Sequence, residues 1–222
     1  MSIVVSVNVG RRRTSAHTDL NVTGIDKRPV PGPVEVRAPG PKGVGGSGLI
    51  GDEVCDKRHH GGEEQAVYAY AREDLDAWAE EFGGPPRAGL FGANLTTSGV
   101  DVSGALVGEH WQIGPDLVLA VTGPRIPCRT FAGWLDRRGW VKTFTRRGCP
   151  GAYLRVVRPG AVRAGDRLRV VHRPDHEASV NLVFRAITIE PELLDRLVDV
   201  PDLPEDVREM ARKRVTFTLD GA

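Results

Sequence analysis

The sequence has few cysteines, and this scarcity excludes several classes of protein. Cys55, Cys128 and Cys149 are the only three among 222 residues. An odd number of widely spaced cysteines is a poor disulfide framework. Three thiolates are also fewer than the four that usually hold an iron–sulfur cluster. We therefore expect free thiols and a reducing, cytoplasmic environment.

Long apolar runs and an excess of one charge are also missing. No run reaches the ~18 apolar residues of a membrane-spanning helix, and the N-terminus alternates like a strand, unlike a signal peptide. The 30 Lys and Arg residues balance 29 Asp and Glu residues, which leaves a net charge of +1. This balance argues against a protein that coats a nucleic acid polymer. We predict neither a membrane nor a nucleic acid partner, and any anion site must be local.

The sequence before residue 173 has the pattern of a mainly β protein. Short runs rich in Val, Ile, Tyr and Trp favour half-buried strands, and many of the 27 Gly and 16 Pro residues fall between them. Many short strands with frequent turns favour a closed or nearly closed barrel. The predicted strands are Ile3–Val9, Val34–Arg37, Ala66–Ala71, Leu106–Ile113, Leu117–Thr122, Tyr153–Val157 and Arg167–His172.

One helical pattern interrupts these strands. Leu75, Trp78, Ala79 and Phe82 follow the i, i+3, i+4, i+7 spacing of one buried helix face. Gly83, followed by Gly-Pro, supplies the cap and breaker residues that end such a helix. We predict a single helix here, with Trp78 in the core.

The character of the sequence changes near Arg173. Three short helical patterns follow: one after Ser179, a favourable N-cap, one opened by Pro191 and one opened by Pro204. We predict two domains, a β-barrel over residues 1–172 and a three-helix appendage over residues 173–222.

The loop Pro124-Arg125-Ile126-Pro127-Cys128 is the most informative stretch. Two prolines stiffen the backbone around Arg125, and a second arginine, Arg129, follows the cysteine. Nearby positive charge favours the thiolate, the form that ligates metals and attacks electrophiles. By itself, the loop does not distinguish a metal ligand from a nucleophile or a small buried residue.

Other stretches carry reactive or ligand-binding side chains in a fixed order along the chain. Each is weak alone: two adjacent cations are as often a solvated turn as a site, and runs of arginine are most often solvated. The stretches, with the Cys128 loop as the fourth in order, are 25–34 with Lys27, 51–62 with His60-Gly61-Gly62, 91–99 with Asn94 and Thr96, and 148–156 with Cys149.

This ordered set resembles the MOSC domain family, named for the C-terminal domain of molybdenum cofactor sulfurase, and within it the bacterial YiiM-like group. The resemblance covers roughly Thr23 to His172, and the three-helix tail is similar to the 3-alpha domain of that group. Its most specific part is Pro-Arg-x-Pro-Cys followed by Gly-x-Tyr-Leu-Arg-Val.

The resemblance implies a MOSC-type β-barrel that binds molybdenum cofactor, a molybdopterin-type pterin with an oxo-molybdenum centre and a phosphate. Cys128 corresponds to the proposed molybdenum ligand and catalytic residue. Arg125 and Lys27 correspond to residues that hold the anionic groups. A soft thiolate suits a sulfur-rich metal centre, and the two cations suit a phosphate.

Further site residues follow from the same resemblance. His60 is expected to orient the site or shuttle a proton, since histidine titrates near neutral pH. Gly61 and Gly62 would let the backbone approach a ligand closely. Asn94 and Thr96 would contact cofactor or substrate, or hold their loop by local hydrogen bonds.

The function implied is a molybdenum-dependent oxidoreductase that reduces small N-hydroxylated compounds, such as hydroxylaminopurine-type bases, to amines. The chain has no Gly-x-Gly-x-x-Gly fingerprint after a strand, so we expect a separate reductase to supply electrons. The alternative is a non-enzymatic carrier or sulfur-delivery module for the cofactor. A metal-free barrel for another phosphorylated ligand is a weaker third hypothesis.

The chain departs from the family pattern at two positions. Ala93 stands where the family usually has glutamate, which removes a candidate general acid. Cys55 stands where a small apolar residue is usual. Cys55, His59 and His60 do not predict a zinc site, because no second pair of ligands has suitable spacing.

Overall fold

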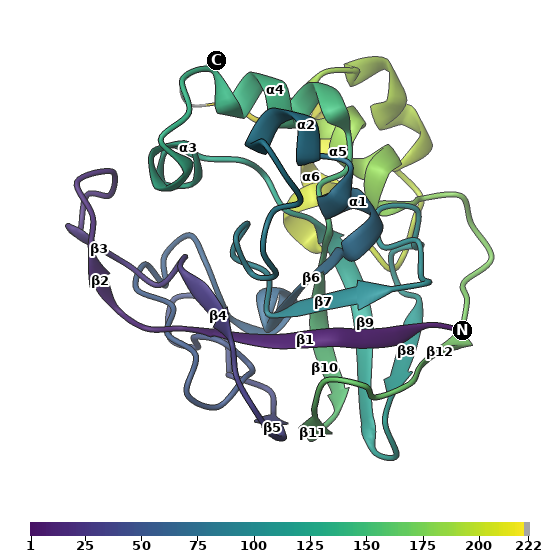
Figure 1. The fold of residues 1–222 in the computed structure, drawn as a ribbon. Helices are drawn as coiled ribbons and strands as arrows, with labels where there is room; N and C mark the ends of the chain where they lie inside the picture. The colour runs from purple at the N-terminus through teal and green to yellow at the C-terminus, as the bar shows by residue number, and fades with distance from the viewer. Residues whose placement is uncertain (220–222) are drawn as a thin grey trace.

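The computed structural model describes residues 1–219 and is built on an eight-stranded sheet (Figure 1). The strand order is β12-β8-β9-β10-β6-β7-β1-β4. All neighbours are antiparallel except β6 and β7. The strands are β1 (Ile3–Gly10), β4 (Lys27–Pro29), β6 (Val67–Ala71), β7 (Leu95–Ser98), β8 (His110–Ile113), β9 (Leu117–Pro124), β10 (Ala152–Arg158) and β12 (Leu168–His172).

Strand β1, second from one end of the sheet, approaches β12 at the other end without a continuous ladder. Ile3 forms an isolated antiparallel bridge to Arg167, and the amide of Val4 donates to the carbonyl of Asp166 at 2.9 Å. The mainly β prediction is confirmed, although the described sheet is not a fully closed barrel. Two small sheets pair β5 (Val34–Val36) with β11 (Gly160–Val162), and β2 (Arg13–Thr14) with β3 (Val22–Thr23).

Each predicted strand is present, most within two residues of its expected ends. The predicted strand Leu106–Ile113 is shorter, because Leu106 forms an isolated bridge to Ser179, residues 107–108 form a turn and only His110 onwards joins the sheet. The prediction missed β7, whose Leu-Thr-Thr-Ser sequence is polar. The structure buries Thr96 and Thr97 completely between β6 and β1, so tertiary pairing makes this strand.

The predicted helix around Trp78 is two short helices, α1 (Arg72–Asp76) and α2 (Ala79–Phe82). The helix breaks at Trp78, whose backbone φ of −91° and ψ of 5° leave the helical region. The indole is fully buried and donates to the hydroxyl of Tyr70 at 3.1 Å. Gly83 ends α2 in the left-handed conformation, as its position predicts.

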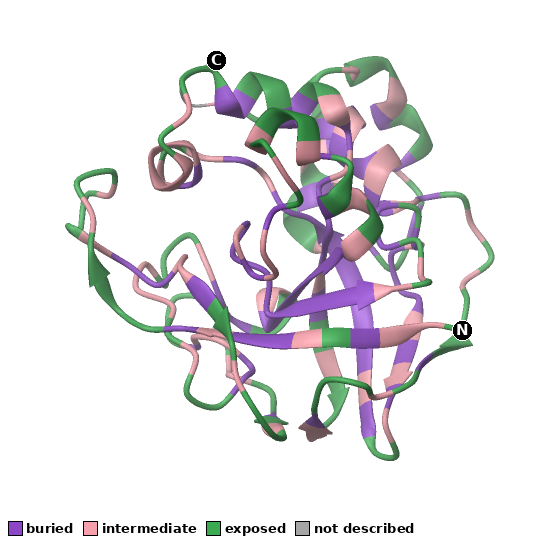
Figure 2. Ribbon diagram, in the orientation of Figure 1, coloured by how far each residue is buried: buried purple, intermediate pink, exposed green. Residues whose placement is uncertain are grey.

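Two helices that the sequence analysis did not predict cover an aromatic cluster. They are α3 (Arg129–Leu135) and α4 (Trp140–Arg147), and a 3₁₀ turn, η1 (Glu63–Gln65), precedes β6. Figure 2 shows the buried interior along the central strands and the exposed outer faces of the helices. The cluster includes Tyr68, Tyr70, Trp78, Phe91, Phe131, Trp140, Phe144 and Phe184.

The C-terminal helical patterns are confirmed as α5 (Val180–Thr188), η2 (Pro191–Arg196) and α6 (Glu205–Lys213), although η2 is a 3₁₀ helix. The Ser179 hydroxyl caps α5 by accepting from the amide of Leu182. These elements share a hydrophobic cluster of their own, to which Val107 of the sheet region also belongs. The division into residues 1–172 and 173–222 stays a prediction, and residues 220–222 lie outside the described part.

Among the described residues, none of the helices combines the length and the apolar character needed to cross a membrane.

Candidate functional site

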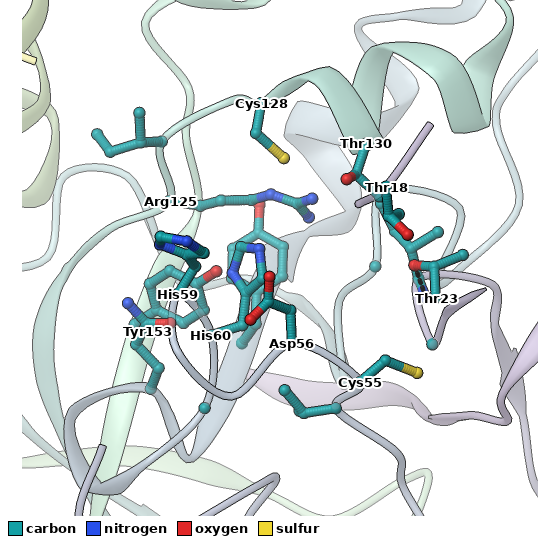
Figure 3. A pocket seen from close by; sticks show the side chains of 18 of the residues that line it. Thr18, Thr23, Cys55, Asp56, His59, His60, Arg125, Cys128, Thr130 and Tyr153 are labelled. Carbon is teal, nitrogen blue, oxygen red and sulfur yellow. Dashed lines mark hydrogen bonds between the residues drawn. The ribbon is translucent and has the colours of Figure 1, made fainter. Parts of the chain in front are cut away.

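A cavity of about 850 Å³ opens where several loops meet beside the sheet (Figure 3). Its walls come from the segment before β4, the 52–61 loop, the Pro124–Thr130 loop and two tyrosines of the sheet. The segments are far apart in sequence, so the tertiary fold makes the cavity. The predicted site residues that line it are Lys27, His60, Gly61, Asn94, Arg125 and Cys128.

Cys128 lies between the end of β9 and the start of α3. Its backbone is extended, with φ of −137°, and its carbonyl accepts from the amide of Ala132 at 3.1 Å. The side chain is partly exposed. In Figure 3 the thiol points into the cavity, on the side where the guanidinium of Arg125 lies. The thiol is therefore accessible to a ligand in the cavity.

Arg125 is buried, with 6% of its surface exposed. Its guanidinium carbon lies 4.2 Å from the ring centroid of Phe131 and 5.2 Å from that of Tyr68. One nitrogen donates to the backbone carbonyl of Phe91. Within residues 1–219 no carboxylate forms an ion pair with this guanidinium. Arg125 is thus a buried cation held by aromatic faces and a carbonyl.

Gly92 makes room for this guanidinium. Its φ is +79°, and a Cβ atom there would lie 3.0 Å from the Nη1 atom of Arg125 and 3.2 Å from the side chain of Ile25. A side chain at position 92 would therefore be strained and would press on the arginine.

Lys27 also lines the cavity, but its charge already has a partner. The Nζ atom lies 2.5 and 2.6 Å from the two carboxylate oxygens of Asp52, whose side chain is completely buried. Asp52 also accepts from the amide of Gly10 at 2.7 Å and from Asn94 at 2.8 Å. Burial lowers the pKa of Lys27, and the Asp52 carboxylate opposes that shift. The predicted role of Lys27 as an anion holder is therefore weakened by an internal counter-charge.

Asn94 and Thr96 hold the loop rather than present free polar groups. The Asn94 oxygen accepts from the amide of Tyr68 at 3.1 Å, and its nitrogen donates to Asp52. Thr96 has no exposed surface and is not among the residues that line the cavity. Its hydroxyl accepts from Asn8 at 3.3 Å. The structure thus supports the hydrogen-bonding alternative for both residues.

His60 faces the cavity (Figure 3), but its chemistry differs from the expectation. Burial, with a further contribution from the positive charge of Arg125, lowers the pKa of His60 to about 4. The imidazole is therefore neutral at pH 7 in the ligand-free protein. The expectation that His60 titrates near neutral pH was therefore wrong, because burial lowers its pKa.

Gly61 and Gly62 have a structural role in addition to the predicted approach to a ligand, which stays a prediction. Gly61 lines the cavity, whereas Gly62 does not. A Cβ atom at Gly61 would meet the carbonyl oxygen of Gly46 at 2.6 Å, and one at Gly62 would meet the Cα atom of Lys42 at 2.7 Å. Both glycines also have φ near +79°. Close packing of the 42–46 loop therefore requires them.

Three residues with a role in the site were not selected from the sequence. Tyr68 and Tyr153 are cross-strand neighbours on β6 and β10, with ring centroids 5.2 Å apart, and both line the cavity. Burial raises the pKa of Tyr153, and Arg125 opposes that shift. The third is Asp52. The alternation of the two predicted strands could have placed both tyrosines on one face.

The remaining cysteines lie in different surroundings. Cys55 lines the cavity on another wall from Cys128 (Figure 3). Cys149 does not line it, and burial together with the Asp74 carboxylate raises the pKa of its thiol to about 11. Within the described part of the chain, no group of three or more His, Cys, Asp or Glu side chains is placed to hold a metal ion.

The arginine runs do not surround the cavity. Residues 11–13, 137–138 and 146–147 are absent from its lining, and Arg147 pairs with Glu81 at 2.7 Å. Arg129 does line the cavity, but it pairs with Asp19 at 2.5 Å. Arg125 is therefore the buried cation of the cavity that has no carboxylate partner within residues 1–219, whereas Lys42, which also lines the cavity, is exposed.

Comparison with known sequences relates this chain to two named proteins. Protein YiiM of Escherichia coli is 35% identical over 131 residues, which cover 57% of each chain. A protein named "Reductase" from Gibberella moniliformis is 28% identical over an alignment of 232 residues, gaps included, that covers 99% of this chain and 39% of that protein. The chain thus spans less than two thirds of the length of either relative.

Solved structures show the same fold. The crystal structure of YiiM from Geobacillus stearothermophilus matches with a TM-score of 0.76 and 27% identity, covering 97% of this chain and all of that one. YiiM from Escherichia coli matches with a TM-score of 0.71 at 23% identity, covering 96% of this chain and 92% of that one. The family model described as MOSC domain matches residues 56–169, about half of the chain. The chain therefore belongs to the MOSC domain family.

Proposed function

We propose that this protein is a molybdenum-cofactor-binding oxidoreductase that reduces N-hydroxylated compounds to amines. One observation carries the proposal: the accessible thiol of Cys128 and the unpaired, buried guanidinium of Arg125 face one cavity. A buried cation without a counter-charge is costly unless a ligand pairs with it. The family assignment supplies the expected ligand, because MOSC domains are associated with molybdenum cofactor.

The residues present fit this cofactor. A thiolate is a soft ligand suited to a sulfur-rich metal centre. A guanidinium suits a phosphate or another oxyanion. The volume of about 850 Å³ lies towards the upper end of the roughly 300–1,000 Å³ typical of ligand pockets. Cys128 would hold the metal and Arg125 the anionic groups, with Lys27 in a supporting role.

The chemistry determines what the protein residues must do. Bound molybdenum cofactor supplies a centre that exchanges two electrons and accepts oxygen, so R–NHOH with two electrons and two protons gives R–NH₂ and water. The protein must supply or relay these protons. Ala93 cannot, because its side chain has no ionisable group and is buried.

His60 and Tyr153 are the candidates for proton relay, because both line the cavity near Arg125. An anion beside Arg125 would cancel part of the positive charge that lowers the pKa of His60. Ligand binding would thereby raise the pKa of His60, which favours the protonated imidazole that can donate a proton.

A separate reductase would supply the electrons. No dinucleotide-binding fingerprint follows a strand in this sequence. The relative named "Reductase" extends well beyond the region that matches this chain, and its name supports an oxidoreductase role here.

The test compares single cysteine variants expressed in a molybdate-fed host. We expect Cys128→Ser to lose both bound molybdenum and turnover of an N-hydroxylated substrate with an artificial electron donor. Cys149→Ser is the matched control, because that thiol lies outside the cavity, and it should keep both properties. Full activity of Cys128→Ser would refute the proposal.

Ala93 also favours a second candidate, a carrier or sulfur-delivery module for the cofactor. A carrier needs to bind the cofactor but does not need to deliver protons to a substrate. Purified protein that retains molybdenum and turns over no N-hydroxylated substrate would support the carrier and exclude the reductase.

A further inference from the structure

Part of the cavity wall comes from the extreme C-terminal part of the described chain. Asp206 of α6, Phe217 and Thr218 line the cavity together with the Cys128 loop. All three lie outside residues 56–169, which match the family model. The C-terminal appendage therefore contributes to the site.

The backbone of this segment is anchored to the helices. Arg214 ends α6 in the left-handed conformation, with φ of 54°, and pairs with Asp195 at 2.8 Å. The amide of Val215 donates to the carbonyl of Met210 at 3.1 Å, and that of Phe217 to the carbonyl of Ile187 at 2.8 Å. Phe217 is thus held in place by its backbone.

The ring of Phe217 is not used in the core. It is 41% exposed and belongs to none of the hydrophobic clusters. No other aromatic ring within the described chain stacks on it. Leaving a phenyl ring partly in water is unfavourable, and a flat apolar ring laid against it would bury both surfaces.

We infer that Phe217 determines substrate specificity by stacking on a planar ring of the substrate. The inference rests on the proposed function. It names a C-terminal residue that selects N-hydroxylated heteroaromatic compounds over N-hydroxylated compounds without a ring. Phe217 is not assigned a role in the redox step, because Cys128 and Arg125 provide the metal and anion contacts.

Val215 offers a matched control in the same segment. It is similarly exposed, at 47%, but it does not line the cavity. Removing either side chain has a comparable effect on the solvent-exposed surface, whereas only Phe217 can touch a ligand in the cavity.

The experiment measures kcat/KM for 6-hydroxylaminopurine and N-methylhydroxylamine with molybdenum-loaded wild type, Phe217→Ala, Phe217→Tyr and Val215→Ala. Base stacking on an aromatic side chain contributes about 1–3 kcal/mol. We therefore expect Phe217→Ala to lower kcat/KM for the purine at least about fivefold and to leave the ring-free substrate unchanged. Phe217→Tyr should retain the preference, and Val215→Ala should behave like wild type.

Two outcomes would overturn the inference: an unchanged purine preference in Phe217→Ala, or an equal loss for both substrates. Failure of the proposed function is seen separately, as loaded wild type that turns over neither substrate. Calorimetric binding of adenine to the same variants then decides the inference. Weaker binding by Phe217→Ala than by Val215→Ala supports it, and equal binding overturns it.

Discussion

Two buried cations at one cavity have opposite surroundings. Lys27 is 7% exposed and lies 2.5 Å from the Asp52 carboxylate, which Gly10 and Asn94 also bind. Arg125 is 6% exposed and, within residues 1–219, contacts a carbonyl and aromatic rings but no carboxylate. The protein itself supplies a counter-charge for Lys27, whereas Arg125 has no carboxylate partner among the described residues.

The difference separates a structural charge from a ligand-binding charge. A buried ion pair with satisfied hydrogen bonds fixes the geometry of the loops that carry it. A buried cation without a counter-charge destabilises the free protein and therefore favours an anionic ligand. Residue type and spacing make Lys27 and Arg125 look equivalent, and only their partners distinguish them.

Removing the carboxylate of Asp52 tests the structural role of the Lys27–Asp52 ion pair and should have the largest effect on stability. Asp52→Ala leaves Lys27 buried without a partner, which costs about 3–5 kcal/mol of unfolding free energy. Urea unfolding of the ligand-free protein measures this loss. The double variant Lys27→Met/Asp52→Asn removes both charges and should recover most of it. A loss in the double variant as large as in Asp52→Ala would contradict the interpretation.

The histidine beside Arg125 gives a second test through pH. Its pKa falls from an ordinary value of 6.5 to about 4 in the folded protein. Between pH 4 and pH 6.5, His60 binds more protons in the unfolded state than in the folded state. The free energy of unfolding is therefore highest above pH 6.5, as far as His60 determines it, and it decreases as the pH falls towards 4.

The slope from one proton is at most about 1.4 kcal/mol per pH unit. We expect the unfolding free energy of wild type to fall more steeply than that of His60→Gln over this window. Nearby carboxylates affect both proteins alike, so the difference isolates His60. If the unfolding free energies of wild type and His60→Gln change in parallel with pH, the pKa of His60 is not lowered in the folded protein.

Removing the charge of Arg125 should have the smallest effect on stability. Arg125→Met removes an unpaired buried charge along with one hydrogen bond and the aromatic contacts. We expect the unfolding free energy of the ligand-free protein to change by less than about 1 kcal/mol, or to rise. We also expect added phosphate to raise the melting temperature of wild type and to leave that of Arg125→Met unchanged. A loss of stability as large as in Asp52→Ala would show that the two cations have the same role.

Helices and strands were predicted well where apolar residues recur at a regular spacing in the sequence. The apolar face of α5, with Val180, Val183 and Phe184, is fully buried as the spacing predicts. The helix at Trp78 was predicted as continuous but is interrupted at that residue, while the indole is buried as predicted and donates to Tyr70. The polar strand β7 and the short helices α3 and α4 were missed. Their formation depends on pairing and packing with other elements of the fold and not on a local sequence pattern.

The candidate site was predicted in part. The Cys128 loop and Arg125 were found, because a stiff basic loop with a cysteine is a local pattern. The contacts of Lys27 were not, because its partner Asp52 is 25 residues away. The role of Gly61 and Gly62 depends on a loop that begins near Lys42, which no local pattern reveals.

The sequence by itself determined the order of the motifs, the family they indicate and the residues that carry reactive groups. These depend on residue identity and short spacing, which the chain displays directly. The tertiary structure alone decided which cation is neutralised, how far the pKa of His60 is lowered and that Phe217 reaches the cavity. Each depends on the distance and burial of groups far apart in the chain, because electrostatic and packing energies depend on separation in space.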